Sequence, residues 1–263
     1  MLSVTPIPAF SDNYIWLLRQ DTSDSVCVVD PGDASPVIEW LEREGLTLGT
    51  ILITHHHPDH TGGVSELIQR YSPRVIGPHN PSITGIDEPV GDGDEIRVMG
   101  RLFDVLELPG HTLDHIAFFT AGIPPLLFSG DVLFSAGCGR LFEGSPEQMH
   151  QSLSRLDNLP EETLVFAAHE YTLANLRFAK PSNRTIGTWS RPSTNACAPE
   201  NSNVPRYPAP WAVNVASILS CAVTRKGCAG AHRSTAAPTP SWQPSPPCAP
   251  GKIPSDTLFG NAL

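Results

Sequence analysis

The feature that most constrains this chain is a short apolar run followed at once by a dense group of histidines and one aspartate. The run is rich in β-branched isoleucine and is typical of a buried strand. In an extended backbone alternate side chains share a face, so we expect His55 and His57 to point together and His56 to point the other way. Asp59 and His60 follow past a turn, within reach of a second metal roughly 3.5–4 Å from the first. The spacing therefore predicts a binuclear metal site.

Three other apolar strands also end in a possible ligand, namely His111, Asp131 and His169. Ligand sites of layered α/β proteins gather at strand ends, because the strands are rigid and the loops beyond them reach solvent. The five histidines and two aspartates fill two sites if one carboxylate bridges. Imidazole and carboxylate ligands without thiolates suit two Zn²⁺ ions, with iron or manganese as alternatives. The competing interpretation is a set of unrelated polar surface loops.

Apolar runs and turn signals predict strands that alternate with helices through the first 180 residues. The expected strands cover 4–8, 14–18, 26–30, 51–54, 75–76, 96–99, 102–108, 116–119, 126–131 and 164–170. Ser35 is the expected N-cap of a first helix that stops at Gly45, and further helices are expected over 64–71, 145–156 and 172–178. This alternation predicts an α/β fold with helices covering sheets.

The remaining histidines are interpreted as ordinary surface or hydrogen-bonded residues. His115 is the exception, because its place near His111 makes it a candidate outer donor that orients a ligand. His56 is not a ligand candidate because it should face away from its neighbours. Three others are isolated in the sequence from the predicted ligands, namely His79, His150 and His232.

Composition excludes several classes of protein. A content of 40% hydrophobic residues in 263 suffices for a real core, and the formal charge of −10 argues against a nucleic-acid surface. There is no apolar run of roughly 18 residues and no basic, apolar leader, so we expect no membrane span and a cytoplasmic protein. Six cysteines in this length do not make a disulfide scaffold. We expect a monomer.

The order and spacing of these motifs resemble the metallo-β-lactamase superfamily. The motif is Thr-His-x-His-x-Asp-His at 54–60, followed by Gly-His-Thr at 110–112, Gly-Asp at 130–131 and a later histidine at 169. More narrowly, the segments 12–16, 138–144 and 169–176 resemble the glyoxalase II family, the hydroxyacylglutathione hydrolases. The resemblance covers about residues 2–179.

This resemblance implies an αββα sandwich with two metals. The implied ligands are His55, His57 and His111 for one metal, Asp59, His60 and His169 for the other, with Asp131 bridging. It also implies that Arg140 and Tyr171 contact glutathione. Phe142 stands where the family often has tyrosine, and Asp114 stands where a glycine is common, which could disturb the turn that holds His115.

The activity implied is hydrolysis of S-D-lactoylglutathione, a small-molecule thioester, to glutathione and D-lactate in methylglyoxal degradation. Two metals lower the pKa of a bridging water, towards about 7 even for one zinc, and Asp59 can orient the hydroxide. One alternative is another enzyme of the same fold, either a persulfide dioxygenase that uses one iron or a lactone hydrolase. A second alternative is a non-catalytic, poorly folded product.

The chain changes character near residue 180. Residues 1–180 hold 25 of the 27 acidic residues, whereas 181–263 hold 13 of the 27 prolines. The gene region that encodes this tail can also be read in a shifted frame, in which each codon starts at the third base of a present codon. That frame would permit three segments that resemble glyoxalase II sequence, in the right order and followed by a stop codon. We therefore interpret 1–179 as the catalytic domain and 180–263 as an out-of-frame, Pro-rich tail in place of a helical substrate-binding domain. The alternative is a genuine disordered tail, and sequencing the gene across codons 175–185 decides between the two.

Overall fold

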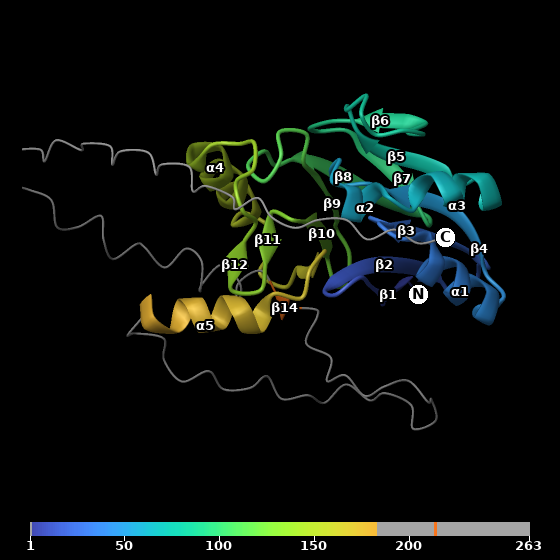
Figure 1. The fold of residues 1–263 in the computed structure, drawn as a ribbon, viewed down its shortest axis with the longest axis horizontal. Helices are drawn as coiled ribbons and strands as arrows, with labels where there is room; N and C mark the ends of the chain where they lie inside the picture. The colour runs from blue at the N-terminus through green and yellow to red at the C-terminus, as the bar shows by residue number, and fades with distance from the viewer. Residues whose placement is uncertain (1, 183–212, 215–263) are drawn as a thin grey trace, which may run out of the picture. The chain divides into compact units, whose positions relative to one another are not determined.

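A computed structural model describes residues 2–182 and 213–214 of the chain (Figure 1). The first of its two large sheets has the strand order β1-β2-β3-β4-β5-β6. Its strands are β1 (Leu2–Ala9), β2 (Asn13–Gln20), β3 (Ser25–Val29), β4 (Thr47–Leu52), β5 (Arg74–Pro78) and β6 (Glu88–Val90). Strands β1 to β3 pair antiparallel, and β3 to β6 pair parallel.

The second sheet has the order β14-β13-β10-β9-β8-β7, and a separate short hairpin lies between β10 and β13 in sequence. Its strands are β7 (Glu95–Val98), β8 (Arg101–Glu107), β9 (Ile116–Thr120), β10 (Leu126–Gly130), β13 (Leu164–Ala167) and β14 (Val213–Asn214). The hairpin consists of β11 (Leu133–Phe134) and β12 (Gly137–Cys138). Only β10 and β13 pair parallel in this sheet as described.

Helices cover the outer faces of the two sheets, which confirms the predicted αββα sandwich. Helices α1 (Ala34–Glu44) and α3 (Val64–Tyr71) pack on the first sheet in one apolar cluster. Helix α4 (Pro146–Leu156) packs on the second sheet in another cluster. The single-turn α2 (Pro58–Thr61) and the later α5 (Thr172–Ser182) complete the helices of the described chain. No helix among these residues is long and apolar enough to cross a membrane.

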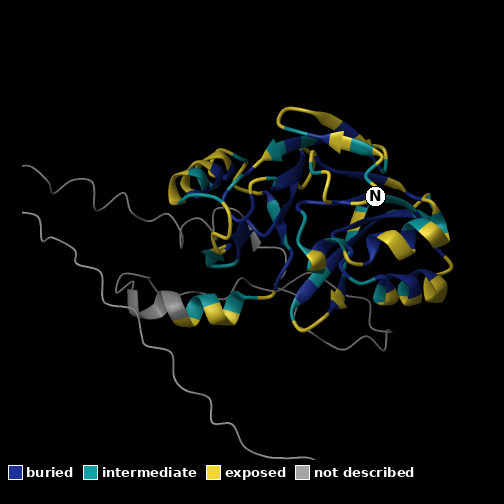
Figure 2. Ribbon diagram, turned by 45° about the horizontal axis from the view of Figure 1, so that its top comes forward, coloured by how far each residue is buried: buried dark blue, intermediate teal, exposed yellow. Residues whose placement is uncertain are grey.

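The strands are apolar on both faces because each sheet is covered on both sides. In β2, Ile15 and Leu17 face α1 and α3, whereas the alternate residues Trp16 and Leu18 enter the core between the sheets. The same alternation occurs in β10, where Phe128 joins the core between the sheets and Leu127 packs towards α4. Figure 2 shows this burial in the two sheets, with exposed residues on the outer faces of the helices. Strands buried on both faces give the loops at their ends rigid anchors.

Several predicted boundaries differ from the structure for local reasons. The N-cap of the first helix is Asp33, two residues before the predicted Ser35, because the Asp33 carboxylate accepts from the Ser35 N–H at 2.9 Å. Its predicted stop at Gly45 is confirmed, with φ of 66°. Strand β4 ends at Leu52, so the histidines after it lie in irregular backbone rather than in a strand.

Most of the predicted Pro-rich tail lies outside the described residues, together with His232 and the interpretation of a shifted reading frame. Within the described part, α5 continues to Ser182, past the predicted domain boundary at residue 179. Two further residues of the predicted tail form β14, which pairs with β13.

Two segments far apart in sequence touch where β3 and α2 meet. An added Cβ at Gly32 would lie 1.8 Å from the backbone oxygen of Asp59. The neighbouring Gly63 N–H donates to the Pro31 carbonyl at 2.9 Å. The loop after β3 therefore fixes the position of the helical turn that carries Asp59 and His60.

We expect Gly32→Ala to lower the free energy of unfolding by about 1–3 kcal/mol, because the methyl group must push α2 away. Gly91→Ala is the matched control, since its added Cβ lies 3.0 Å from the end of the flexible Glu107 side chain. Urea unfolding of both variants measures the difference. Equal stability of the two variants would contradict the tight approach at Gly32.

Candidate metal centre

The seven residues predicted as ligands lie together at the ends of four strands. They follow β4, β8, β10 and β13, with Asp59 and His60 carried by α2. Their ligand atoms form three overlapping groups, each within 4.8 Å: His55, His57 and His111; His55, His60 and Asp131; Asp59, His60 and His169. The proximity expected from the strand ends is present, and their role as ligands stays a prediction.

The first group consists of three imidazoles whose nitrogens converge. The His57 Nδ1 lies 3.1 Å from the His55 Nε2 and 3.0 Å from the His111 Nε2. Burial, and then neighbouring histidines, lower the pKa of His55 and of His57 below the usual value. Imidazole nitrogens that converge in this way are an arrangement that a bound cation stabilises.

The second group pairs imidazoles with carboxylates. The Asp59 Oδ2 lies 3.5 Å from the His60 Nε2 and 3.4 Å from the His169 Nε2. Burial opposes the charged ring of His169, but hydrogen bonds to Asp131 and Asp59 raise its pKa to about 10. For His60, burial is likewise outweighed, here chiefly by the nearby Asp30, and its pKa is raised. Without a metal, protons therefore occupy this group.

Asp131 lies between the two groups and faces both. Its Oδ2 is 3.3 Å from the His111 Nε2, while its Oδ1 is 3.6 Å from the His60 Nε2 and 3.4 Å from the His169 Nε2. Burial raises its pKa, but the hydrogen bond with His169 and the neighbouring histidines bring the net shift below the usual value. The carboxylate is thus ionised and divided between the groups.

The buried atoms of the centre fit a divalent metal better than they fit one another. The His60 Nε2 and the Asp131 Oδ1 are buried and have no hydrogen-bond partner within the described residues. A buried polar atom without a partner costs about 1–3 kcal/mol. Imidazole nitrogens and carboxylate oxygens that point into one space are the ligand set of zinc, iron and manganese sites.

Asp30 is a functional candidate that the sequence interpretation missed. Its carboxylate accepts from the Thr54 N–H at 2.8 Å and from the Thr54 hydroxyl at 2.7 Å, and it lies 3.1 Å from the His60 Nδ1. The second ring nitrogen of a metal-binding histidine commonly contacts such an acceptor, which fixes the ring orientation. Its position directly after β3, beside β4 in the sheet, was the signal available in the sequence.

The other outer contacts come from two further places. The Asp12 Oδ1 lies 2.8 Å from the His169 Nδ1, and the Asn13 amide donates to the Asp59 Oδ2 at 3.1 Å. The His111 Nδ1 donates to the backbone carbonyl of Arg140 at 2.8 Å. Each of these contacts fixes the face that a ligand presents to the centre.

His115 has a different role from the predicted outer donor. Its Nε2 accepts from the backbone N–H of Asp131 at 3.0 Å, and its ring stacks on His55 with centroids 4.8 Å apart. Burial lowers its pKa to about 3, so the ring is neutral. His115 therefore positions one predicted ligand by a hydrogen bond and another by packing.

The three predicted glutathione contacts line two sides of the centre. Phe142 is 61% exposed, and its ring lies edge-on to His57 and His111. The Arg140 guanidinium lies 5.9 Å from the centroid of the Phe142 ring. On the other side, Tyr171 stacks on His169 with ring centroids 4.9 Å apart. These residues flank the metal groups, and their contact with glutathione stays a prediction.

Of the histidines set aside, two are exposed and lie outside the metal groups of the described residues, namely His79 and His150. His56 lies outside the three groups of predicted ligand atoms, but its ring centroid lies 5.1 Å from that of the His57 ring instead of facing away from it, and it joins a fourth group with Asp114 and Glu143. This arrangement was not predicted.

Comparison with known proteins decides the family. A family model described as the metallo-beta-lactamase superfamily matches residues 10–169. A hydroxyacylglutathione hydrolase of Chromohalobacter salexigens is 72% identical over 180 residues, which are 68% of this chain and 71% of that protein. The chain belongs to the metallo-β-lactamase superfamily, in its hydroxyacylglutathione hydrolase family. The family membership predicted from the motifs is thereby confirmed, and the His and Asp clusters of this family imply a divalent metal.

Other matches to the superfamily are consistent with this. A hydroxyacylglutathione hydrolase of Pseudomonas entomophila is 59% identical over 183 residues, covering 68% of this chain and 70% of that protein. Among solved structures, ETHE1 from Myxococcus xanthus is 32% identical with a TM-score of 0.57, covering 65% and 76% of the two chains. TTHA1623 in a di-iron-bound form is 28% identical with a TM-score of 0.54, covering 66% and 96%.

We expect Asp30→Asn to weaken metal binding about 10- to 100-fold, because the amide cannot accept from both Thr54 and His60. Asp33→Ala is the control, since it removes a helix cap three residues away and touches none of the predicted ligands. Competition with a chromogenic chelator measures both affinities. Unchanged affinity in Asp30→Asn would show that the contact with His60 does not orient the ring.

Proposed function

We propose that this protein hydrolyses the thioester bond of S-(2-hydroxyacyl)glutathione, with S-D-lactoylglutathione as substrate, to glutathione and D-lactate. The observation that carries the proposal is the 72% identity to a hydroxyacylglutathione hydrolase over 180 residues, together with the family match over residues 10–169, which include all seven predicted ligands. The identity to ETHE1 is much lower, at 32%, which favours the hydrolase over another activity of the fold.

We propose two zinc ions, with iron or manganese as alternatives, at the two groups of ligand atoms. His55, His57 and His111 would hold one ion, Asp59, His60 and His169 the other, and the two oxygens of Asp131 would face one each. The di-iron form of TTHA1623 supports a pair of ions. Such ions supply a water of lowered pKa and an electrophile for the thioester carbonyl.

The chain's own residues orient and bind. Asp59 is 41% exposed at its side chain and is fixed by Asn13, so it lies where it can accept a hydrogen bond from an attacking water. Arg140 offers a cation for a glutathione carboxylate, and the faces of Phe142 and Tyr171 offer apolar contact. Thiols have low pKa values compared with alcohols, so glutathione leaves as a thiolate without a dedicated acid.

Domain organisation and cellular setting are also proposals. We propose that residues 1–179 form the catalytic domain and that 180–263 replace a helical substrate-binding domain through a shifted reading frame. We further propose a monomer that acts in the cytoplasm, the compartment in which glutathione keeps thiols reduced.

We expect the purified chain to release free thiol from S-D-lactoylglutathione, to lose this activity on dialysis against a chelator, and to regain it with Zn²⁺. Asp59→Asn is expected to lower kcat by about 10²-fold or more, because it removes the carboxylate that orients water. Thiol titration with D-lactate quantification measures the reaction. Oxygen consumption with glutathione persulfide, without thioester cleavage, would instead identify a dioxygenase.

The two groups should respond differently to pH when metal binds. His169 holds a proton up to about pH 10 in the metal-free protein, so metal must displace it at neutral pH. The apparent Zn²⁺ affinity of the second group should therefore rise about tenfold per pH unit for each proton displaced, between about pH 6.5 and 8.5. His55 and His57 have lowered pKa values, so the first group should change little.

Zinc titrations at several pH values, with calorimetric detection of released protons, test this difference. His169→Ala should remove the pH-dependent binding step and leave the other. Two equal, pH-independent steps would contradict the assignment of protons to the second group.

A further inference from the structure

His56 connects three loops that surround the predicted centre. Its side chain is 25% exposed, and each of its ring nitrogens faces a different carboxylate. The Nδ1 lies 2.9 Å from the Asp114 Oδ1, and the Nε2 lies 3.3 Å from the Glu143 Oε1. The ring therefore joins the loop after β4 to the loop after β8 and to the loop that precedes α4.

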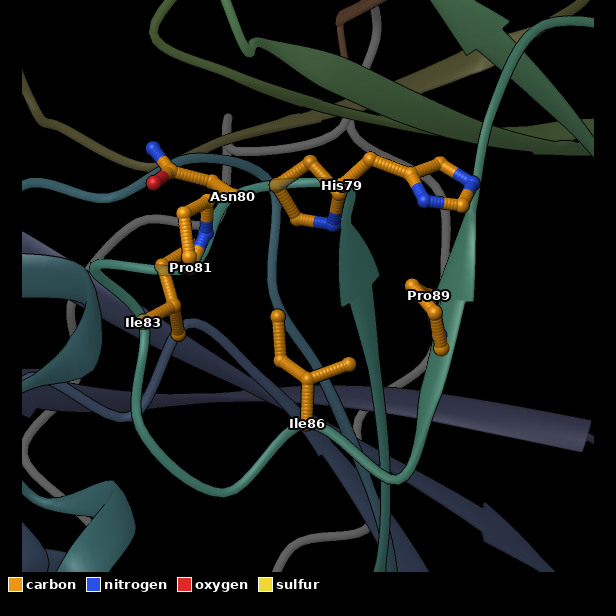
Figure 3. A pocket seen from close by; sticks show the side chains of 7 residues that line it. His79, Asn80, Pro81, Ile83, Ile86 and Pro89 are labelled. Atoms are coloured by element: carbon orange, nitrogen blue, oxygen red, sulfur yellow. The ribbon is translucent and has the colours of Figure 1, made fainter.

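Both carboxylates are held by second partners, so the connection is not a pair of loose surface contacts. The Asn80 amide donates to the Asp114 Oδ2 at 2.7 Å, and the Leu113 N–H donates to the Glu143 Oε2 at 2.8 Å. Asn80 also borders a hollow beside β5, where its amide points away from the apolar Ile86 (Figure 3). We call the set His56, Asp114, Glu143 and Asn80 the loop clasp.

The geometry of the loop clasp differs from that of a third metal site. A metal would take one nitrogen of His56 and draw both carboxylates to that side of the ring. Here the two carboxylates lie at opposite ring nitrogens, and the four carboxylate oxygens all have partners on the chain. The arrangement is that of a hydrogen-bonded bridge.

The segment that the bridge holds also carries two predicted glutathione contacts. Glu143 directly follows Phe142, and both of their N–H groups reach the His111 carbonyl, at 3.4 and 3.1 Å. The Phe142 ring lies against the His57 ring, with centroids 5.4 Å apart, and the His56 ring also lies against the His57 ring, with centroids 5.1 Å apart. Movement of Glu143 would therefore move Phe142 relative to the metal groups.

We propose that His56 is a positioning residue, which through Glu143 and Asp114 fixes the substrate-binding segment 140–143 at the correct distance from the metal groups. The proposal rests on the proposed glutathione thioester as substrate. It also gives a role to Asp114, which stands where the family commonly has glycine. The Asp114 carboxylate contacts the Nδ1 of His56. His56 itself belongs to none of the three groups of predicted ligand atoms.

The test compares His56→Ala with His56→Gln, which can still donate to a carboxylate, and with His150→Ala as an exposed histidine control. Each variant is assayed on S-D-lactoylglutathione and on S-D-lactoyl-N-acetylcysteamine, which has the same acyl thioester but lacks the peptide. Metal content is measured by atomic emission, and binding of S-hexylglutathione is measured by calorimetry. The metal content and the binding assay do not depend on turnover.

For His56→Ala we expect kcat/KM on S-D-lactoylglutathione to fall about 10- to 100-fold, mainly through KM, because a displacement near 1 Å in a binding group has effects of this size. The loss on the truncated thioester should be at least about fivefold smaller, and S-hexylglutathione should bind correspondingly more weakly. His56→Gln should recover part of the loss, and metal content should match wild type and His150→Ala.

Equal losses on both thioesters, reduced metal content, or unchanged binding of S-hexylglutathione in His56→Ala would each overturn the positioning role. If the wild type binds S-hexylglutathione but does not cleave S-D-lactoylglutathione, the proposed function fails while a weakened binding in His56→Ala still supports the role of His56. If His56→Ala does not fold, Glu143→Gln, which retains shape and loses the charge, replaces it with the same expected ratio between substrates.

Discussion

The main constraint on this structure is that the nitrogen and oxygen atoms of seven side chains converge on one space, where they cannot all form hydrogen bonds with one another. Three imidazole nitrogens that lie about 3 Å apart cannot all be satisfied by one another, and two buried atoms of the centre have no hydrogen-bond partner in the described chain. Such an arrangement is unfavourable unless the surroundings hold it in place. The two sheets do this, since the predicted ligands follow strands β4, β8, β10 and β13, whose buried apolar side chains belong to the three core clusters.

The two groups of predicted ligands, which we call the first and second halves of the centre, differ in how their charges are balanced. In the first half burial lowers the pKa values of His55 and His57, whereas the second half balances raised histidine pKa values against a lowered pKa of Asp131. Asp131 lies where the two halves meet, and its backbone N–H is held by the neutral ring of His115. The difference follows from the carboxylates: Asp30 and Asp12 contact the second half, while a backbone carbonyl contacts the first.

The sequence predicted the sandwich and the convergence of the ligand candidates because both follow from short-range patterns. Apolar runs that end in His or Asp mark strand ends, and strand ends meet at one edge of a sheet. The residues that were missed depend on contacts between distant segments. Asp30 ends an apolar run, as the predicted ligands do, but its contact with His60 depends on the pairing of β3 with β4 and is not visible in the local sequence. His56 was expected to face away from His57, but its ring contacts the His57 ring, and its carboxylate partners come from loops that only the folded chain brings together.

The contact between Gly32 and Asp59 limits which substitutions and insertions the two loops can accept. The loop after β3 and the turn of α2 approach so closely that neither can gain an atom without displacing the other. An insertion or a bulkier residue in either loop would be transmitted to Asp59 and His60 before it altered the surface. Larger side chains are therefore better accommodated at exposed positions such as Leu113, Leu141 and Phe142, where they can extend into solvent.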